Sequence, residues 1–83
     1  GEPVRLLVFG GSQGASLFST VVPAAVESLP EALRKRLKVV QQARENEIET
    51  LAGAYRQAQV EAELAPFYKD LPMRIAGAHL VIA

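Results

Sequence analysis

The 83-residue chain contains no cysteine, no tryptophan and only one histidine. Without cysteine, neither a disulfide framework nor a thiolate metal site can form. A single histidine also argues against a zinc centre made by protein side chains alone. We therefore predict that this chain holds no metal ion and needs no cofactor.

An excess of charge of either sign is missing as well, because nine basic residues balance nine acidic ones. Nucleic-acid binding normally needs a strongly basic face, so we predict no nucleic-acid partner. No apolar run approaches the roughly 20 residues of a membrane span, and the N-terminus lacks the basic-then-apolar order of a signal peptide. A cytoplasmic location is the expectation. The basic group Arg34, Lys35, Arg36 and Lys38 is interpreted as a solvated helix end rather than a membrane contact.

Short apolar runs alternate with segments of helical periodicity. Strands are expected at about 5–9, 37–41, 60–64 and 79–83. Helices are expected at about 15–29, at 46–57 with Asn46 as N-cap, and from Asp70 onward. Pro23 should kink or divide the first helix, and Pro30 should start a second short turn. The buried face of the first helix is assigned to Leu17, Val21, Val22, Ala25, Val26 and Leu29.

This β-α-β-α-β-α-β order predicts an α/β fold, a partial doubly wound (Rossmann-like) parallel sheet with strand order 3-2-1-4. The last run, Leu80 to Ala83, reads as a buried parallel strand. Such a strand needs cover on both faces, so we expect residues 1–83 to be a fragment of a larger domain. Tyr55 is expected in the core, and Phe67 at the carboxyl edge of the sheet.

The most informative segment is Gly10-Gly11-Ser12-Gln13-Gly14, which lies between the first strand and the first helix. This arrangement directs the unpaired N–H groups of a helix N-terminus at an anion. In the predicted strand order, the segment also lies at the crevice where the winding direction reverses. Both observations favour a site for a phosphate-bearing ligand.

Several ligand chemistries fit a glycine-rich turn of this kind. A dinucleotide site needs G-x-G-x-x-G and an acidic residue at the end of the second strand. Here the spacing differs, and the second strand ends in Gln41 and Gln42, which could hydrogen-bond a ribose instead. A Walker loop is excluded because Gly-Lys-Ser/Thr is missing.

The segment also matches G-x-S-x-G, the nucleophile elbow of serine hydrolases, and Asp70 and His79 follow in a plausible order. However, His79 is expected at the opposite sheet edge, roughly 15 Å from the turn, beyond the reach of a base. Two further interpretations remain. Ser12 and the amides of Gln13 and Gly14 would hold a diphosphate, or the turn is an inert structural feature.

Nearly the whole chain resembles the start of the C-terminal lobe of the MurG family of bacterial glycosyltransferases. The resemblance rests on four segments: Leu6 to Ala15 (LLVFGGSQGA), Val39 to Gln42 (VVQQ), Ala65 to Leu71 (APFYKDL) and Ala78 to Ala83 (AHLVIA). Pro23, eight residues beyond Ala15, matches the family as well. The glycine-rich string after a strand is its most specific part.

The resemblance implies the first half of a GT-B C-terminal domain, which is the donor-binding domain of these enzymes. It implies that Ser12 contacts the diphosphate of UDP-N-acetylglucosamine, with Gly11, Gln13 and Gly14 beside it. Tyr68 falls where the family usually has an isoleucine whose backbone holds the uracil ring, so the side chain departs from the pattern. No catalytic residue of the family falls on this chain.

The implied reaction transfers N-acetylglucosamine to a lipid-linked muramyl-pentapeptide during peptidoglycan synthesis, which supports cell shape and division. The acceptor would bind an N-terminal lobe that this chain lacks, so the 83 residues alone are not expected to catalyse. The implied location is the cytoplasmic, inner face of the plasma membrane, with peripheral membrane association only in the intact protein.

Overall fold

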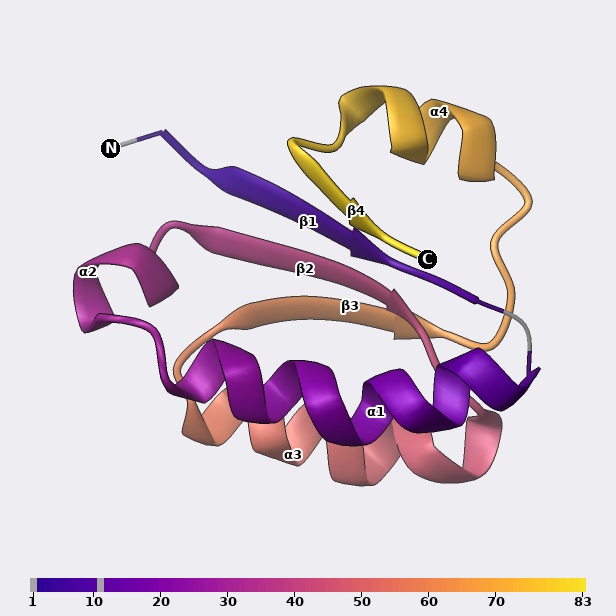
Figure 1. The fold of residues 1–83 in the computed structure, drawn as a ribbon, viewed down its shortest axis with the longest axis horizontal. Helices are drawn as coiled ribbons and strands as arrows, with labels where there is room; N and C mark the ends of the chain where they lie inside the picture. The colour runs from indigo at the N-terminus through magenta and orange to yellow at the C-terminus, as the bar shows by residue number, and fades with distance from the viewer. Residues whose placement is uncertain (1, 11) are drawn as a thin grey trace.

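The computed structural model describes residues 2–10 and 12–83, and the side chains of residues 2–10 and 17–83. Its centre is a sheet of β1 (Val4–Val8), β2 (Leu37–Gln42), β3 (Glu61–Ala65) and β4 (Leu80–Ile82). The strand order is β3-β2-β1-β4, and every neighbouring pair is parallel. Figure 1 shows the four strands running in one direction. The predicted fold class and strand order are confirmed.

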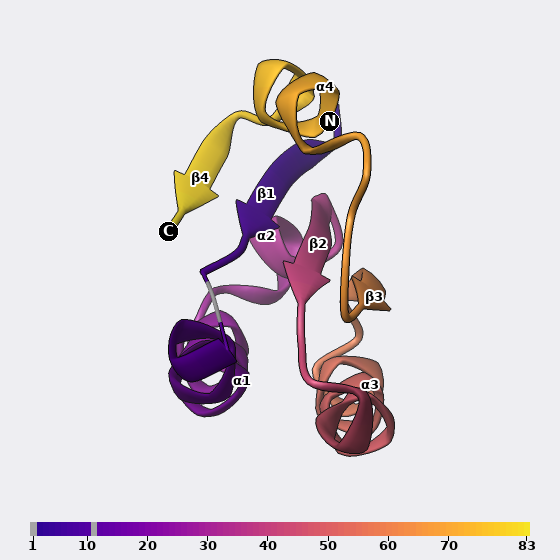
Figure 2. The same cartoon turned by 90° about the vertical axis from the view of Figure 1, so that its right-hand side faces the viewer.

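Helices cover both faces of the sheet, as a doubly wound fold requires. Figure 2 shows α1 (Ser12–Glu27) and α3 (Ile48–Gln57) on one face and α4 (Leu71–Gly77) on the other. The short α2 (Glu31–Arg34) follows Pro30, at the turn predicted there.

The main core lies between the sheet and the α1/α3 layer. Leu6 and Val8 of β1 face this layer, and the register puts Leu6 beside Val39 of β2. The core consists of Leu6, Val8, Val22, Val26, Leu37, Val39, Ala43, Leu51, Tyr55, Ala58 and Val60. Burial of this apolar surface is the main stabilising contribution to such a small domain. Tyr55 is 1% exposed, so its prediction as a core residue is confirmed.

Pro23 is expected from the sequence to kink or divide the first helix, but α1 runs through it as one helix, so the expected division is wrong. A proline removes one backbone hydrogen bond from a helix interior. Val22 and Val26, on either side of the ring, are 4% and 3% exposed. Their burial packs the helix against the sheet on both sides of the proline.

The apolar face of α1 is wider than the surface that covers it. Leu17 and Val21 are 59% and 51% exposed and Ala25 is also exposed, so their assignment to the buried face is wrong. The helix packs over β1 and β2, whereas Val21 lines an apolar hollow that it shares with Leu80 and Ile82 of β4.

The start of α3 also differs from the prediction. A 3₁₀ turn, Glu45–Glu47, precedes the helix, and α3 begins at Ile48. Asn46 lies within this turn and is not the N-cap. The amide of Glu47 already donates to the carbonyl of Arg44 at 2.8 Å, so the tighter turn satisfies a helix-entry donor through the backbone.

Candidate functional site

The site lies at the carboxyl edge of the sheet, where β1, β2 and β3 end. Figure 1 shows that α1 begins near this edge and that the segment from β3 to α4 leaves from it. β1 has β2 on one side and β4 on the other, so the winding direction reverses at β1. In open α/β sheets, ligands bind in the crevice at this switch point. The 16-residue helix α1 begins here at Ser12.

The glycine-rich residues lie at this edge only as far as the structure describes them. The backbone of Ser12, Gln13 and Gly14 forms the first turn of α1, so the helix begins three residues earlier than the predicted start at residue 15. Gly11, and the side chains of Ser12 and Gln13, lie outside the described part of the chain. Their contact with a diphosphate therefore stays a prediction.

The side chain of Gln42, at the end of β2, joins the two segments that border this edge. Its Oε1 accepts a hydrogen bond from the backbone N–H of Gly10 at 3.2 Å. Its Nε2 donates to the backbone carbonyl of Pro66 at 3.1 Å. The sequence suggested Gln42 as a ribose ligand, but both ends of this amide are already occupied by backbone groups.

Gln41, the other candidate ribose ligand, points to the opposite face of β2. It is 0% exposed, and its Oε1 accepts the hydroxyl proton of Tyr55 in α3. Alternation along a strand directs successive side chains to opposite faces. Gln41 is therefore a core residue, and its proposed ribose contact is wrong.

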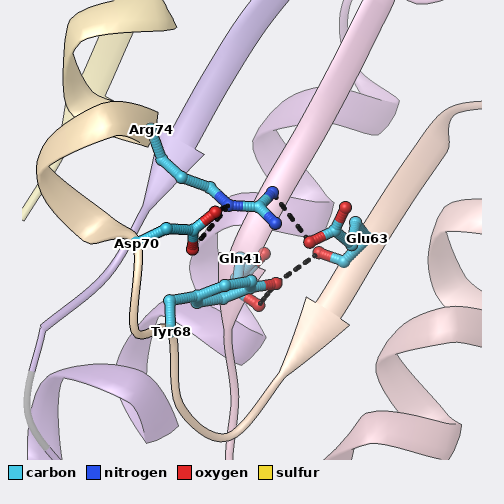
Figure 3. A network of polar contacts seen from close by, with 5 residues as sticks. All are labelled: Gln41, Glu63, Tyr68, Asp70 and Arg74. Atoms are coloured by element: carbon cyan, nitrogen blue, oxygen red, sulfur yellow. Dashed lines mark hydrogen bonds and ion pairs between the residues drawn. The ribbon is translucent and has the colours of Figure 1, made fainter.

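Tyr68 lies between β3 and α4, with its side chain turned onto the sheet. Figure 3 shows its hydroxyl directed at the ends of β2 and β3. There it meets the backbone carbonyls of Glu63 at 3.2 Å and Gln41 at 3.5 Å. Through its hydroxyl, Tyr68 thus connects the segment after β3 to both β2 and β3.

Arg74 of α4 encloses the Tyr68 ring from the other side. Its guanidinium carbon lies 4.8 Å from the ring centroid. The same group pairs with Glu63 at 2.8 Å, and its Nε donates to both carboxylate oxygens of Asp70 at 3.1 and 3.0 Å. Figure 3 shows this network spanning β3, the following segment and α4. Sequence reasoning missed it, because Arg74 and Glu63 are eleven positions apart in different elements.

The environment of Tyr68 keeps its hydroxyl protonated. Burial, followed by the negative charge of Glu63, raises the pKa of Tyr68 to about 12. Since both neighbouring groups are carbonyl oxygens, only the protonated hydroxyl can bond to either of them. At neutral pH the side chain therefore acts as a hydrogen-bond donor to the sheet.

Phe67, beside Tyr68, is 67% exposed. The prediction that it packs against the carboxyl edge of the sheet is wrong, because Tyr68 takes that position instead. Its ring is left facing outward from the segment between β3 and α4.

His79 lies at the other end of β1 from the glycine-rich turn. Its Nδ1 accepts the backbone N–H of Arg5 at 2.9 Å, and its own N–H donates to the carbonyl of Arg5. Arg5 is the second residue of β1, whereas Ser12 comes four residues after Val8, the last residue of that strand. A base must lie within hydrogen-bond reach of its nucleophile, so this geometry opposes the hydrolase interpretation.

The basic group near β2 is engaged in contacts within the chain. Lys35 pairs with Glu31 at 3.3 Å, and Lys38 pairs with Glu61 at 3.5 Å. Arg34 and Arg36 donate to backbone carbonyls: Nη1 of Arg34 to Ala58 at 2.9 Å and Nε of Arg36 to Glu2 at 3.0 Å. These contacts agree with the interpretation as a solvated helix end.

Among the described residues, no group of three or more histidine, cysteine, aspartate or glutamate side chains is arranged to hold a metal ion. Within the same part of the chain, no helix is long and apolar enough to cross a membrane.

Comparison with known proteins gives the chain close relatives. It is 58% identical over 80 residues to the UDP-N-acetylglucosamine--N-acetylmuramyl-(pentapeptide) pyrophosphoryl-undecaprenol N-acetylglucosamine transferase of Phenylobacterium zucineum. That match covers 96% of this chain and 22% of the relative. The transferase of the same name from Nitrobacter winogradskyi is 48% identical over 83 residues, covering 100% of this chain and 23% of the relative. The chain thus spans less than a quarter of the length of these relatives.

A solved structure supports the fold. The crystal structure of Acinetobacter baumannii MurG superimposes with a TM-score of 0.78 at 24% identity, covering 96% of this chain and 24% of that one. At this identity the likeness establishes the α/β architecture alone. At the level of sequence, residues 5–83 match the glycosyltransferase family 28 C-terminal domain. The chain therefore belongs to the glycosyltransferase family 28 C-terminal domain family.

Proposed function

We propose that this chain is the donor-binding part of a glycosyltransferase that uses UDP-N-acetylglucosamine. The observation that carries the proposal is the position of a strand–glycine turn–helix unit at the switch point of a family 28 domain. The names of the relatives supply the donor and the reaction. The intact protein would transfer N-acetylglucosamine to a lipid-linked muramyl-pentapeptide in peptidoglycan synthesis, with consequences for cell shape and division.

In this proposal the diphosphate binds at the N-terminus of α1. The amides of Ser12, Gln13 and Gly14 and the Ser12 hydroxyl are the proposed donors, with Gly11 allowing close approach of the backbone. As UDP departs, negative charge grows on its diphosphate, and oriented N–H groups and the positive helix end stabilise that charge. This contribution lowers the barrier to transfer and requires no side chain that ionises.

The uracil ring would be held by the backbone at Tyr68. Because the Tyr68 side chain is turned onto the sheet, its hydroxyl contacts backbone carbonyls of Glu63 and Gln41. A backbone contact to the base does not depend on the usual isoleucine side chain. The departure at this position is thus compatible with uracil recognition.

The acceptor and the membrane would be contacted through parts of the intact protein other than these 83 residues. The lipid-linked muramyl-pentapeptide would bind an N-terminal lobe, and the protein would work at the cytoplasmic face of the plasma membrane. On this proposal the 83-residue chain by itself has no transferase activity.

The proposal is tested by calorimetry on the intact gene product. We expect saturable binding of UDP-N-acetylglucosamine, displaced by UDP and not by GDP. Labelling of Ser12 by a fluorophosphonate probe would instead support the hydrolase interpretation. If neither UDP-N-acetylglucosamine nor UDP binds, the result would support the interpretation of the chain as an inert structural unit.

A further inference from the structure

The inference concerns Gln42 and builds on the proposed donor site. We propose that Gln42 is a positioning residue that sets the distance between the diphosphate-binding turn, residues 10–14, and the uracil-binding segment, residues 66–68. Gln42 does not contact the donor in this scheme. It acts through the two backbone segments that do.

The topology explains why such a residue is needed. The two segments follow β1 and β3, which are not neighbours, because β2 lies between them. Adjacent strands are about 4.8 Å apart, so the ends of β1 and β3 are separated by about 10 Å. No ladder hydrogen bond can join them directly. A side chain from the end of β2 is therefore well placed to tie one to the other.

Gln42 makes this tie with both ends of its amide. The carbonyl oxygen accepts the N–H of Gly10 at 3.2 Å, and the amide nitrogen donates to the carbonyl of Pro66 at 3.1 Å. Gly10 is the first residue of the diphosphate-binding turn, and Pro66 is the first residue of the uracil-binding segment. A bridge from an N–H to a C=O needs an acceptor and a donor on one short group, which the glutamine amide supplies.

Other side chains cannot make the same bridge. A carboxylate at this position accepts from Gly10 but repels the carbonyl of Pro66, since it has no donor when ionised. Methionine has the length of glutamine but offers neither hydrogen bond of useful strength. These two replacements separate the loss of one half of the bridge from the loss of both.

The consequence is specific to ligands that span both segments. UDP-N-acetylglucosamine would contact the turn through its diphosphate and the other segment through its base. When the bridge is absent, the ligand itself must fix the relative position of the two segments, which lowers its affinity. Uridine would contact only one segment, so loss of the bridge should change its affinity little.

The experiment compares Gln42→Met with the wild type in the intact gene product, using calorimetry for UDP-N-acetylglucosamine and nuclear magnetic resonance titration for uridine. We expect the Kd of UDP-N-acetylglucosamine to rise about tenfold, which corresponds to about 1.4 kcal/mol. The Kd of uridine should change less than about twofold, since that ligand does not span the bridge. In turnover assays the change should appear in KM for the donor more than in kcat.

Two matched variants complete the design. Gln57→Met changes an exposed glutamine in α3 and should leave both Kd values unchanged. Gln42→Glu keeps the hydrogen bond from Gly10 and loses the one to Pro66. It replaces Gln42→Met in the experiment if circular dichroism shows that Gln42→Met does not fold. For Gln42→Glu the same contrast between UDP-N-acetylglucosamine and uridine is expected.

Each outcome has a distinct meaning. Unchanged affinity of Gln42→Met for UDP-N-acetylglucosamine, or equal weakening of UDP-N-acetylglucosamine and uridine, would overturn this inference and leave the proposed function standing. Failure of the wild-type protein to bind UDP-N-acetylglucosamine would overturn the proposed function, and this inference with it.

Discussion

The guanidinium carbon of Arg74 lies 4.8 Å from the centroid of the Tyr68 ring, with α4 behind one group and the sheet behind the other. A cation over an aromatic face is attracted by the negative potential of the ring. Because Arg74 also pairs with Glu63 and Asp70, one side chain joins β3, α4 and the segment between them.

Replacing Arg74 with methionine should destabilise the domain by more than the loss of one isolated surface ion pair. The substitution removes two ion pairs and the cation over the Tyr68 ring at once. Urea denaturation of both proteins measures the difference. High salt should reduce it, since part of it is electrostatic.

The control for this variant is Lys35→Met. Lys35 forms an ion pair with Glu31, and the two side chains are 67% and 61% exposed. Its replacement should therefore lower the free energy of unfolding by less than about 0.5 kcal/mol. If Arg74→Met lowers the free energy of unfolding no more than Lys35→Met does, the network around Tyr68 contributes no more to stability than an isolated surface ion pair.

Replacing Tyr68 with phenylalanine should lower the free energy of unfolding by about 0.5–1.5 kcal/mol, the usual net value of one hydrogen bond. It should also change the alkaline pH dependence. The pKa of Tyr68 is about 12 in the folded protein, against 10.0 normally. The stabilisation from the neutral hydroxyl is therefore complete below pH 10 and is lost as the pH rises through about 12.

Stability curves between pH 9 and 12 test this dependence. The wild type should lose stability more steeply than Tyr68→Phe over that range. Some slope should remain in the variant, because burial also raises the pKa of Tyr55. Identical slopes in both proteins would show that the pKa of Tyr68 is not raised by burial and by the charge of Glu63 in the folded protein.

The buried pair of Gln41 and Tyr55 gives a prediction about the core. Tyr55→Phe removes the hydroxyl that donates to Gln41 Oε1 and leaves a fully buried amide oxygen without that partner. The expected cost is about 1–3 kcal/mol. The double variant Gln41→Leu/Tyr55→Phe should recover part of it. A double variant that costs the sum of the two single variants would show that the two side chains are not coupled.

The proposed phosphate contact predicts a loss of donor affinity. Ser12→Ala in the intact gene product should weaken binding of UDP-N-acetylglucosamine by about 1–3 kcal/mol, the range for a hydrogen bond to a charged group. Ser28→Ala is the matched control, since the Ser28 hydroxyl bonds to the carbonyl of Ala25 at the far end of α1. Calorimetry that finds Ser12→Ala and wild type equal in Kd would remove the hydroxyl from the site.

Much of the fold could be predicted because strands and helices have distinct apolar periods. The runs ending at Phe9 and Gln41, with the alternating helices, were enough to give the parallel sheet and its order. The errors concern residues whose burial depends on neighbouring helices and strands. Leu17 and Val21 have the right spacing for burial, but spacing alone does not show how far the neighbouring surface extends.

The candidate site could be proposed from the sequence, whereas the contacts around it could not. The local pattern puts Ser12 between a strand and a helix, and in the structure Ser12 is the first residue of α1. By contrast, the hydrogen bonds of Gln42 join residues 10 and 66, which only the strand order brings together. The sequence offered Gln41 and Gln42 as residues that could hydrogen-bond a ribose, but strand alternation places Gln41 in the core, and the Gln42 amide bonds to the backbone of Gly10 and Pro66.

The central claim is that the carboxyl edge of this sheet binds a uridine diphosphate sugar. Hydrogen-exchange mass spectrometry of the intact gene product, with and without UDP-N-acetylglucosamine, tests it most directly. The account predicts slower amide exchange in two separate segments, residues 9–14 and 65–70, and no change at residues 55–60 near the opposite edge. Saturable binding without protection of either segment would contradict it.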